Sequence, residues 1–263
     1  MYTFLILFFL VTTSQCQPKR ETFTSICKQG PSVWCQDAAT AIECGVVEFC
    51  NIQEARPEGV SRNSDVKPIQ IDLYYEAFCG GCQKFIKEQL YQAFQKLYQH
   101  GVFEISLFPY GNANEKKVGD KWEFECQHGE GECQMNLIET CAVHLLPHPK
   151  QFMPYIHCIE SDPTLANAQK CAKDLQIEWA PISACYNGSE GNILEHQMAQ
   201  RTDALQPKHH YVPWLVIDGV HTERMQTDAQ VDLMEFLCDH FKGTKPADCK
   251  GYLSSKRENR CYK

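Results

Sequence analysis

The sequence has no long apolar run after its first sixteen residues, no surplus of basic residues and no tandem repeat. No later segment approaches the ~20 consecutive apolar residues that a membrane-spanning helix needs. Lysine and arginine number 25 against 33 aspartate and glutamate residues, a formal net charge of −8, so the chain offers no broad basic field for a nucleic acid. We therefore expect neither a membrane span nor a nucleic-acid partner.

Cysteine, in contrast, is abundant. Sixteen cysteines are spread from Cys16 to Cys261, a density that suits an oxidising secretory route better than a cytosol that keeps thiols reduced. The short apolar run Phe4–Val11 precedes small and polar residues. Although no basic segment comes before it, this run predicts a signal peptide over residues 1–16, with cleavage near Ser14 to Cys16. We expect a soluble mature protein.

The motif Cys79-Gly80-Gly81-Cys82 is the most informative part of the sequence. The segment Ile69–Tyr75 predicts a strand before it, and Cys82–Tyr98 predicts a helix after it. Unpaired N–H groups and the positive end of the helix dipole stabilise a thiolate on the first sulfur, and a thiolate is the species that attacks disulfides. We expect Cys79 to attack a substrate disulfide and Cys82 to resolve the mixed disulfide. Gly80 and Gly81 either let a bulky protein backbone approach the sulfur or simply leave the helix entry unobstructed.

The rest of the chain predicts further strands and helices. We first expect a strand over Val102–Phe108 and a polar loop over Asn112–Gly119, followed by a helical block over Cys133–Ala172 and a helix over Ile193–Leu205. A strand from Tyr211 should then turn at Asp218-Gly219 into a second strand. The last expected element is a helix over Asp228–Phe241, capped by Thr227. This order is that of a thioredoxin-like α/β fold with a helical insertion in its middle.

One proline occupies a position that matters in that fold. In the thioredoxin family a proline begins the third strand, follows a cis peptide bond and packs against the Cys-x-x-Cys pair. Pro213, preceded by Val212, stands at the matching place, so the resemblance implies a cis Val212–Pro213 bond that supports the active site. The alternative is an ordinary trans proline at the edge of the sheet.

A second motif lies downstream of the cysteine pair. Its fixed residues are Cys126, Gln127, His128, Gly129, Glu132, Cys133, Asn136 and Cys141. Together with Cys79 and Cys82, this segment resembles the signature of the gamma-interferon-inducible lysosomal thiol reductase family. The resemblance implies a reductase of disulfides in unfolded or partly degraded proteins, acting in an acidic endosomal or lysosomal compartment. It also implies a small thiol, cysteine or glutathione, as electron donor and no bound cofactor.

The signature residues have structural as well as catalytic interpretations. The three cysteines of the signature can tie a loop to the following helix. Gly129 permits a tight turn, and the Asn136 side chain can form a hydrogen bond with the nearby backbone. His128 can exchange a proton with a nearby thiol in acid, or it can be a structural surface histidine. A zinc site formed by His128 and nearby cysteines is a third interpretation, but cysteines of a secreted chain are usually oxidised, so we expect no metal.

Work in acid makes a demand on the pKa of Cys79. At about pH 5 a thiol with a pKa near 8.5 is thiolate only ~0.03% of the time, whereas a pKa near 5 gives about half. A less basic thiolate is also a weaker nucleophile, and this cancels roughly half of the increase in thiolate population on a logarithmic scale. The net gain in reaction rate is still about thirty- to fifty-fold. We therefore expect a strongly lowered Cys79 pKa.

The N-terminal piece is a separate unit. Four cysteines fall within a span too short for a large core, so we expect two disulfides in any of three pairings: Cys27, Cys35, Cys44 and Cys50. Residues 24–54 resemble a saposin A-type module, which implies a small helical unit that relatives can remove during maturation. The alternative is an extension that only assists folding. A polar linker, residues 55–68, separates it from the thioredoxin-like domain, residues 69–241.

Two features concern processing. Asn187-Gly188-Ser189 is a sequon, so we expect a glycan on Asn187 at a surface loop.

Without Cys16 and the active pair, thirteen cysteines remain, and an odd number predicts a free thiol or an intermolecular bridge. In the tail, residues 242–263, Cys261 is the candidate for a disulfide-linked homodimer; the alternative is an internal bond to Cys238 or Cys249.

Two other functions stay open on the sequence alone. A disulfide isomerase or oxidase of the secretory pathway would share the same fold, because the sequence does not fix the redox potential. A non-enzymatic, disulfide-rich protein that binds lipid or a protein partner would use Cys79–Cys82 as a permanent bridge, although a Cys-x-x-Cys pair at a helix start is usually reactive. The first interpretation, a reductase, implies a lysosomal or endosomal location reached through the secretory pathway, with some secretion.

Overall fold

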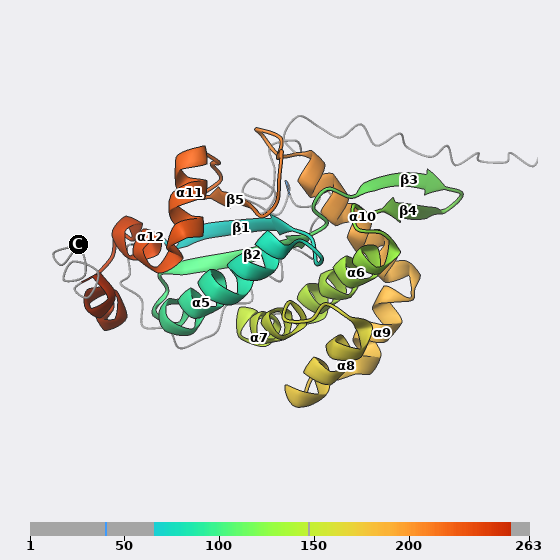
Figure 1. Cartoon of the computed structure of the whole chain (residues 1–263), viewed down its shortest axis with the longest axis horizontal. Helices are drawn as coiled ribbons and strands as arrows, with labels where there is room; N and C mark the ends of the chain where they lie inside the picture. The colour runs from blue at the N-terminus through green and yellow to red at the C-terminus, as the bar shows by residue number, and fades with distance from the viewer. Residues whose placement is uncertain (1–39, 41–65, 147, 254–263) are drawn as a thin grey trace, which may run out of the picture.

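A computed structural model describes residue 40, residues 66–146 and residues 148–253 (Figure 1). The predicted signal peptide, nearly all of the predicted saposin A-type module, most of the linker and Cys261 lie outside the described residues. Within the described ranges, no helix combines the length and the apolar content that crossing a membrane requires.

A three-stranded sheet in the order β2-β1-β5 lies at the centre of the described chain (Figure 1). β1 (Ile69–Tyr75) runs parallel to β2 (Phe103–Pro109), with Ile69 opposite Phe103 and Tyr75 opposite Pro109. β5 (Trp214–Ile217) is antiparallel to β1. All residues of β1 except Gln70 are buried, which explains its nearly continuous apolar sequence, because a strand covered on both faces does not alternate with polar residues.

A long helical segment connects the parallel strands β1 and β2. It consists of α4 (Gly80–Phe85), a π-helical turn (Ile86–Leu90), α5 (Tyr91–Leu97) and a short 3-10 turn (Tyr98–His100). A crossover of this kind is what parallel neighbours need. It ends at Gly101, whose φ of +65° is left-handed and favours glycine. The cysteine motif therefore lies where β1 turns into this helix, as the sequence predicts.

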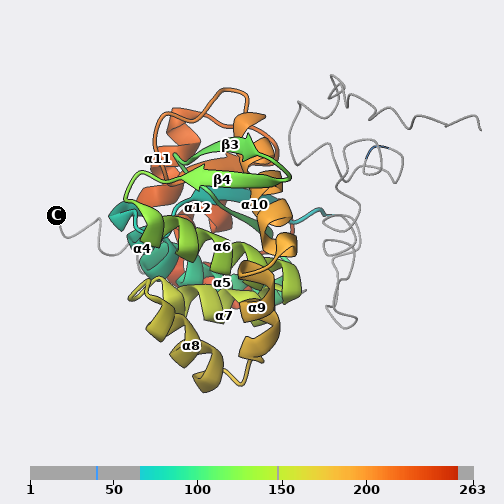
Figure 2. The ribbon, with the colours of Figure 1, turned by 90° about the vertical axis from the view of Figure 1, so that its right-hand side faces the viewer.

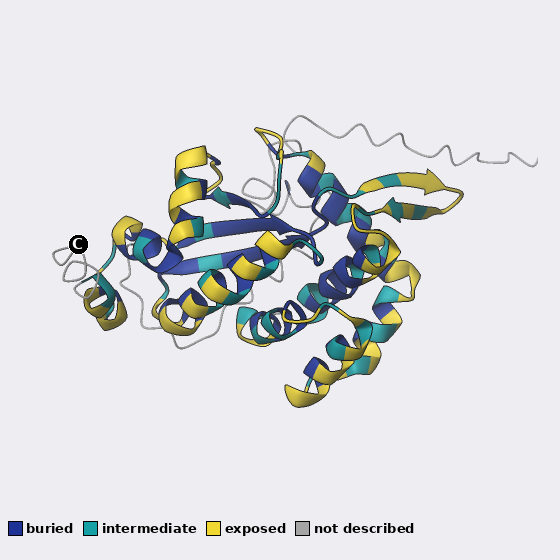
Figure 3. Cartoon of the chain, viewed as in Figure 1, coloured by how far each residue is buried: buried dark blue, intermediate teal, exposed yellow. Residues whose placement is uncertain are grey.

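Core side chains lie on both faces of the sheet. Ile71 and Leu73 belong to the main core, together with Phe85 and Leu90 of the crossover helix. Tyr74 and Phe108 point to a second cluster and stack with ring centroids 4.5 Å apart. Figure 3 shows the buried strands between helices whose outer faces are exposed. The fold is thus a mixed α/β, thioredoxin-like arrangement in which the sheet is covered on two sides.

A helical insertion separates β2 from β5, as predicted. Its helices are α6 (Glu130–Leu145), α7 (Pro149–Ile159), α8 (Leu165–Asp174), α9 (Trp179–Tyr186) and α10 (Ser189–Asp203). Figure 2 shows α6 to α9 gathered beneath the sheet. Disulfides tie α6 to α9 through Cys141–Cys185 and α7 to α8 through Cys158–Cys171. These helices belong to the same core as the sheet and are held by covalent bonds as well as by packing.

Two local predictions were wrong. The segment expected to be a polar loop forms β3 (Asn114–Val118), which pairs with β4 (Lys121–Glu125) in an antiparallel hairpin. β3 is polar except for the exposed Val118, so no alternation of apolar and polar residues marks it. In β4, Trp122 and Phe124 do alternate with charged residues and are half-buried, but this strand covers only five residues. After β5, the expected second strand is only an isolated bridge between Ile217 and Val220.

The C-terminal helix begins earlier than predicted and is divided in two. Thr222, rather than Thr227, caps α11 (Glu223–Val231) by accepting a hydrogen bond from the Met225 N–H at 3.2 Å. Asp232 then caps α12 (Leu233–His240). Two good N-cap residues compete in this stretch, and the apolar pattern alone does not decide between them.

Candidate active site

Cys79 and Cys82 differ in their exposure and in their surroundings. Cys79 is half-buried at the N-cap of α4, where its sulfur accepts a hydrogen bond from the Cys82 N–H at 3.2 Å. Cys82 is fully buried in the main core. The fold therefore presents one sulfur to a substrate and keeps the second behind it.

These surroundings shift the two thiol pKa values in opposite directions. A hydrogen bond with the Cys82 thiol, helped by backbone N–H groups of Cys82 and Gly81, lowers the pKa of Cys79 from 9.0 to about 7. Burial, followed by the neighbouring Cys79, raises the pKa of Cys82 well above its ordinary value. Cys79 therefore ionises at a lower pH than Cys82, which stays a thiol, and this is the division of roles that attack and resolution require.

The shift at Cys79 is smaller than the pKa near 5 that we expected for work in acid. Two effects oppose it, because half-burial of the sulfur and the Glu76 carboxylate both raise the pKa. The first turn of α4 contains no acidic residue, and its lysine, Lys84, lies in its last turn. The first turn of α4 itself therefore supplies backbone N–H groups to the sulfur but no cationic side chain.

The predicted support residues face Cys79. The Val212–Pro213 bond is cis, and the Cys79 thiol donates to the Val212 carbonyl at 3.6 Å. A Cβ placed on Gly81 would lie 3.5 Å from Pro213 and 3.8 Å from the Cys79 sulfur, whereas one on Gly80 would meet nothing within 4 Å. Gly81 thus faces the proline, and Gly80 leaves the approach to the sulfur open.

Gln226 of α11 holds the strand that starts at this proline. Its side-chain nitrogen donates to the Pro213 carbonyl at 2.9 Å, and its oxygen accepts from the Leu215 N–H at 2.8 Å. The side chain is buried. The sequence gives no sign of this role, because a single buried glutamine on an amphipathic helix looks like any surface glutamine until the strand is placed beside it.

The signature residues contact the turn between β1 and α4. Asn136, fully buried on α6, accepts a hydrogen bond from the Ala77 N–H at 2.8 Å. Gln127 accepts from the Asn112 side chain at 2.8 Å. Cys126 and Cys133 form a disulfide that closes the loop before α6, while Cys141 bonds to Cys185 instead. Asn136 is therefore the residue among these that holds the backbone leading to Cys79.

Gly129 serves the same loop. Its φ of +87° is left-handed, and it is the N-cap of α6. A residue with a Cβ is strained in this conformation. The glycine lets the chain turn from the disulfide loop into α6, so that the helix starts beside the Cys79 turn.

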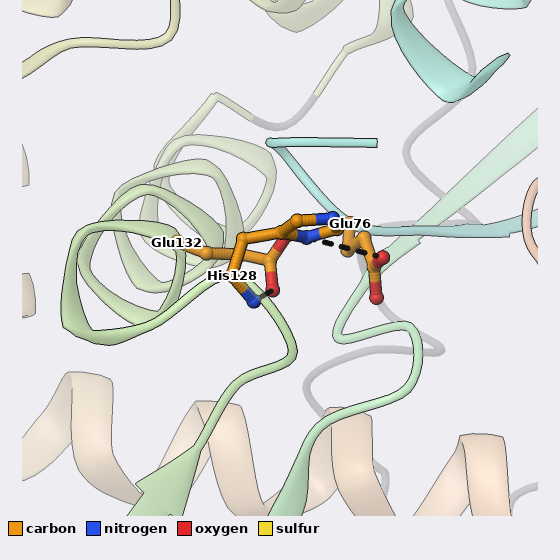
Figure 4. Close-up of side chains that lie close together, drawn as sticks. All are labelled: Glu76, His128 and Glu132. Atoms are coloured by element: carbon orange, nitrogen blue, oxygen red, sulfur yellow. Dashed lines mark hydrogen bonds and ion pairs between the residues drawn. The ribbon is translucent and has the colours of Figure 1, made fainter. Parts of the chain in front are cut away.

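His128 and Glu132 meet Glu76, which directly follows β1 (Figure 4). The His128 ring nitrogen Nδ1 lies 2.6 Å from a Glu132 carboxylate oxygen and 3.7 Å from Glu76 Oε1. Within the described ranges, these three residues form the one group of His, Cys, Asp and Glu side chains whose ligand atoms could converge on a metal ion, all within 4.8 Å of one another. Cys126 and Cys133 offer no thiolate to such an ion, because they are bonded to each other.

Two further buried carboxyl groups belong to α6 and to the end of α7. Glu139 of α6 accepts a hydrogen bond from the Tyr75 hydroxyl at 2.6 Å. Burial raises the pKa of Glu139 and of Glu160, the residue at the end of α7. Glu160 in turn raises the pKa of Cys82. Sequence reasoning missed both. The available signal was a glutamate at a core position of a helix, since Glu139 directly follows Ile138 on the buried face.

The fold and this site define a thioredoxin-fold thiol–disulfide oxidoreductase: a Cys-x-x-Cys pair begins the helix after the first strand and faces a cis-proline before an antiparallel strand. A family model described as "Gamma interferon inducible lysosomal thiol reductase (GILT)" matches residues 70–175, and one described as "Saposin A-type domain" matches residues 24–53.

Named proteins agree with these matches. "Gamma-interferon-inducible lysosomal thiol reductase" of Carassius auratus is 38% identical and spans 98% of this chain and 96% of its own length. The Mus musculus protein of the same name is 36% identical, over 74% of this chain and 77% of its own. The crystal structure of Chlamydia trachomatis DsbA superposes with a TM-score of 0.42 at 16% identity, over 67% of this chain and 96% of that one. The chain belongs to the gamma-interferon-inducible lysosomal thiol reductase family and is a disulfide oxidoreductase, so the non-enzymatic alternative is set aside.

Proposed function

We propose that the protein reduces disulfide bonds of unfolded or partly degraded proteins in an acidic endosomal or lysosomal compartment. The observation that carries the reductase chemistry is the geometry of the pair: half-buried Cys79 at the helix N-cap faces the cis Val212–Pro213 bond, and Cys82 is buried in the core. The opposite shifts of the two thiol pKa values support it. The names of the relatives, which include the word lysosomal, support the compartment.

The chemistry follows from the two thiols. The Cys79 thiolate attacks one sulfur of the substrate disulfide, forming a mixed disulfide, and the other substrate sulfur leaves as a thiolate that takes up a proton. Cys82 then loses its proton and attacks the Cys79 sulfur, which releases the second substrate sulfur. The enzyme pair has given two electrons and is left as a Cys79–Cys82 disulfide. Cysteine or glutathione returns these electrons by two further exchanges, so no bound cofactor takes part.

Transport and processing form part of the proposal. The predicted signal peptide directs the chain into the secretory pathway, from which it reaches the lysosome or is partly secreted. Asn187 is exposed at the end of α9 and accessible to glycosylation. Removal of a glycan by an endoglycosidase should lower the apparent mass of the wild-type protein and leave that of Asn187→Gln unchanged; equal masses before and after treatment of the wild type would contradict glycosylation.

The function is tested with the purified mature protein and a denatured, disulfide-bonded substrate at about pH 4.5 and about pH 7, with free cysteine as donor. We expect activity at the acidic pH that Cys79→Ser abolishes. Cys82→Ser should accumulate the mixed disulfide, because the resolving sulfur is missing. The Cys238→Ser/Cys249→Ser double variant removes another cysteine pair outside the site and should keep its activity. Full activity of Cys79→Ser would refute the mechanism.

A disulfide isomerase or oxidase remains the second candidate, and one observation favours it. A lowered Cys79 pKa stabilises the reduced pair, which makes the oxidised pair a better oxidant. Equilibration of the pair with glutathione buffers measures its reduction potential. If the oxidised enzyme transfers its disulfide to reduced substrates faster than cysteine-fed enzyme reduces them, the oxidase function replaces the reductase.

A further inference from the structure

Three charged side chains from different segments meet next to the active-site turn (Figure 4). Glu76 follows β1, His128 belongs to the loop before α6, and Glu132 lies in the first turn of α6. The side chains of Glu76 and Glu132 are 2% and 1% exposed, whereas that of His128 is 42% exposed. We call these three residues the acid cluster.

Glu132 holds His128 in place. One of its carboxylate oxygens accepts from the His128 backbone N–H at 3.0 Å, and the other lies 2.6 Å from ring nitrogen Nδ1. This double contact fixes the imidazole 3.7 Å from Glu76 Oε1. Two buried carboxylates so close together are unfavourable without a compensating positive charge. A protonated His128 supplies that charge.

Glu76 connects the acid cluster to the nucleophile. It lies three residues before Cys79 in the same turn, and its backbone carbonyl accepts from the Cys79 N–H at 3.2 Å. The carboxylate is fixed by the Asn112 N–H at 2.9 Å and by Gly111, whose missing Cβ leaves the space that the carboxylate fills. The negative charge of this carboxylate is close enough to the Cys79 sulfur to raise the pKa of the thiol and so disfavour the thiolate.

We propose that the acid cluster sets the reactivity of Cys79 according to pH: His128 offsets the Glu76 carboxylate, and protonation of Glu76 in acid removes the remaining negative charge next to the thiolate. His128 and Glu76 are positioning residues, since neither needs to touch the substrate. The inference rests on the proposed function, because it takes Cys79 as the attacking sulfur.

The direction of each pKa shift supports this. Burial, followed by Glu132, raises the pKa of Glu76, so Glu76 takes up its proton at a higher pH than an exposed glutamate. The hydrogen bond to Glu132 raises the pKa of His128, so the imidazole keeps its positive charge over a wider range. In acid the Glu76 carboxylate is therefore neutralised while His128 keeps its positive charge. A neutral Glu76 and a cationic His128 both favour the Cys79 thiolate.

Other titratable groups also face the cysteine pair. Cys82 lies on α4 itself, Glu139 belongs to α6 and Glu160 ends α7. Burial raises the pKa of all three, so these groups are uncharged in acid and do not oppose the effect. Lys87, on the π-helical turn of the crossover helix, lowers the pKa of Glu160.

The test is the rate of Cys79 alkylation between about pH 4 and pH 9, measured by mass spectrometry on the mildly reduced full-length mature protein. We expect His128→Gln to move the midpoint up by about half to one pH unit, and Glu76→Gln to move it down by a similar amount. The double variant should return close to the wild type, because each change removes one of two opposing charges.

A matched control is available in the same fold. His196 on α10 pairs with Glu115 on β3 at 2.7 Å, a His–Glu pair outside the active-site turn, and His196→Gln should leave the pH profile of Cys79 alkylation unchanged.

Alkylation profiles of His128→Gln and Glu76→Gln that superpose on the wild type, or that move in the same direction, would overturn the proposal. Thermal unfolding shows whether each variant folds; if Glu76→Gln does not, the exposed His128 still provides the test. Failure of the proposed function is distinguishable, because it appears as full reductase activity in Cys79→Ser.

Discussion

At the scale of single residues, the signature motif acts through one short turn. Asn136 is buried and binds the Ala77 N–H, and His128 and Glu132 meet Glu76. These contacts are made at Glu76 and Ala77, between the end of β1 and Cys79. Motif residues more than forty positions downstream therefore position the nucleophile without contacting its sulfur.

Asn136→Ala tests this positioning. The change leaves the buried Ala77 N–H without a partner, so we expect the free energy of unfolding to fall by about 1–3 kcal/mol and the reductase activity to fall with it. Urea unfolding and the disulfide-reduction assay measure the two effects. Gln134→Ala, an exposed neighbour on the same helix, should change neither quantity; an Asn136→Ala protein as stable and active as this control would show that the bond is unimportant.

At the scale of secondary-structure elements, the caps of the C-terminal helices offer a second prediction. Thr222→Ala removes the side-chain oxygen that accepts the Met225 N–H, and we expect it to destabilise the fold by about 1 kcal/mol. Thr227→Ala lies inside α11, where alanine has the better helix propensity, so it should be neutral or slightly stabilising. Thermal unfolding of the two variants decides; a larger loss for Thr227→Ala would restore the cap that the sequence predicts.

Elements with a strong apolar pattern could be predicted from the sequence. β1 is found at Ile69–Tyr75 as predicted, and β2 is displaced by one residue because Pro109 can end a strand without donating to it. The helical insertion was predicted as a block, although α9 was missed. Its sequence contains Pro181, which weakens any helical pattern read without its neighbours.

Elements and site residues that depend on partners could not be predicted. β3 is polar except for exposed Val118 and carries no periodic signal of its own, and only Trp122 and Phe124 of the short β4 alternate with charged residues. Cys79 and Cys82 could be identified because their spacing alone indicates their chemistry. Glu76 and Gln226 could not, since a glutamate after a strand and a glutamine on a helix acquire their roles only from the residues that the fold brings beside them.

At the scale of the whole molecule, the disulfides leave one cysteine of the tail to be explained. Cys238 and Cys249 bond to each other, so neither is available to Cys261. The alternative of an internal bond from Cys261 to Cys238 or Cys249 was therefore wrong. We propose that Cys261 forms a disulfide-linked homodimer. Non-reducing electrophoresis should show a band at twice the monomer mass that disappears in Cys261→Ser and persists in Cys79→Ser. A monomeric wild type would contradict the bridge.

The buried carboxyl groups make the stability of the whole fold depend on pH. Burial raises the pKa of Glu195 to about 8 and of Asp72 to about 6, and it raises the pKa values of Glu139 and Glu160. Each group binds its proton more tightly in the folded chain than in the unfolded one, where carboxyl pKa values are about 4. The resulting stabilisation is fully present below about pH 4 and is lost as the pH rises through the folded-state values.

We therefore expect the free energy of unfolding to be larger at about pH 5 than at about pH 7.5, with a slope of up to about 1.4 kcal/mol per pH unit for each carboxyl group within its range. Urea unfolding at the two pH values measures the difference. Glu195→Gln should reduce it, because glutamine keeps an oxygen to accept the Thr140 hydroxyl, now 2.6 Å from the carboxylate, but does not titrate. Equal stability at both pH values would contradict the prediction. A fold that gains stability in acid, around a nucleophile whose charged neighbours also respond to acid, matches the compartment proposed for its activity.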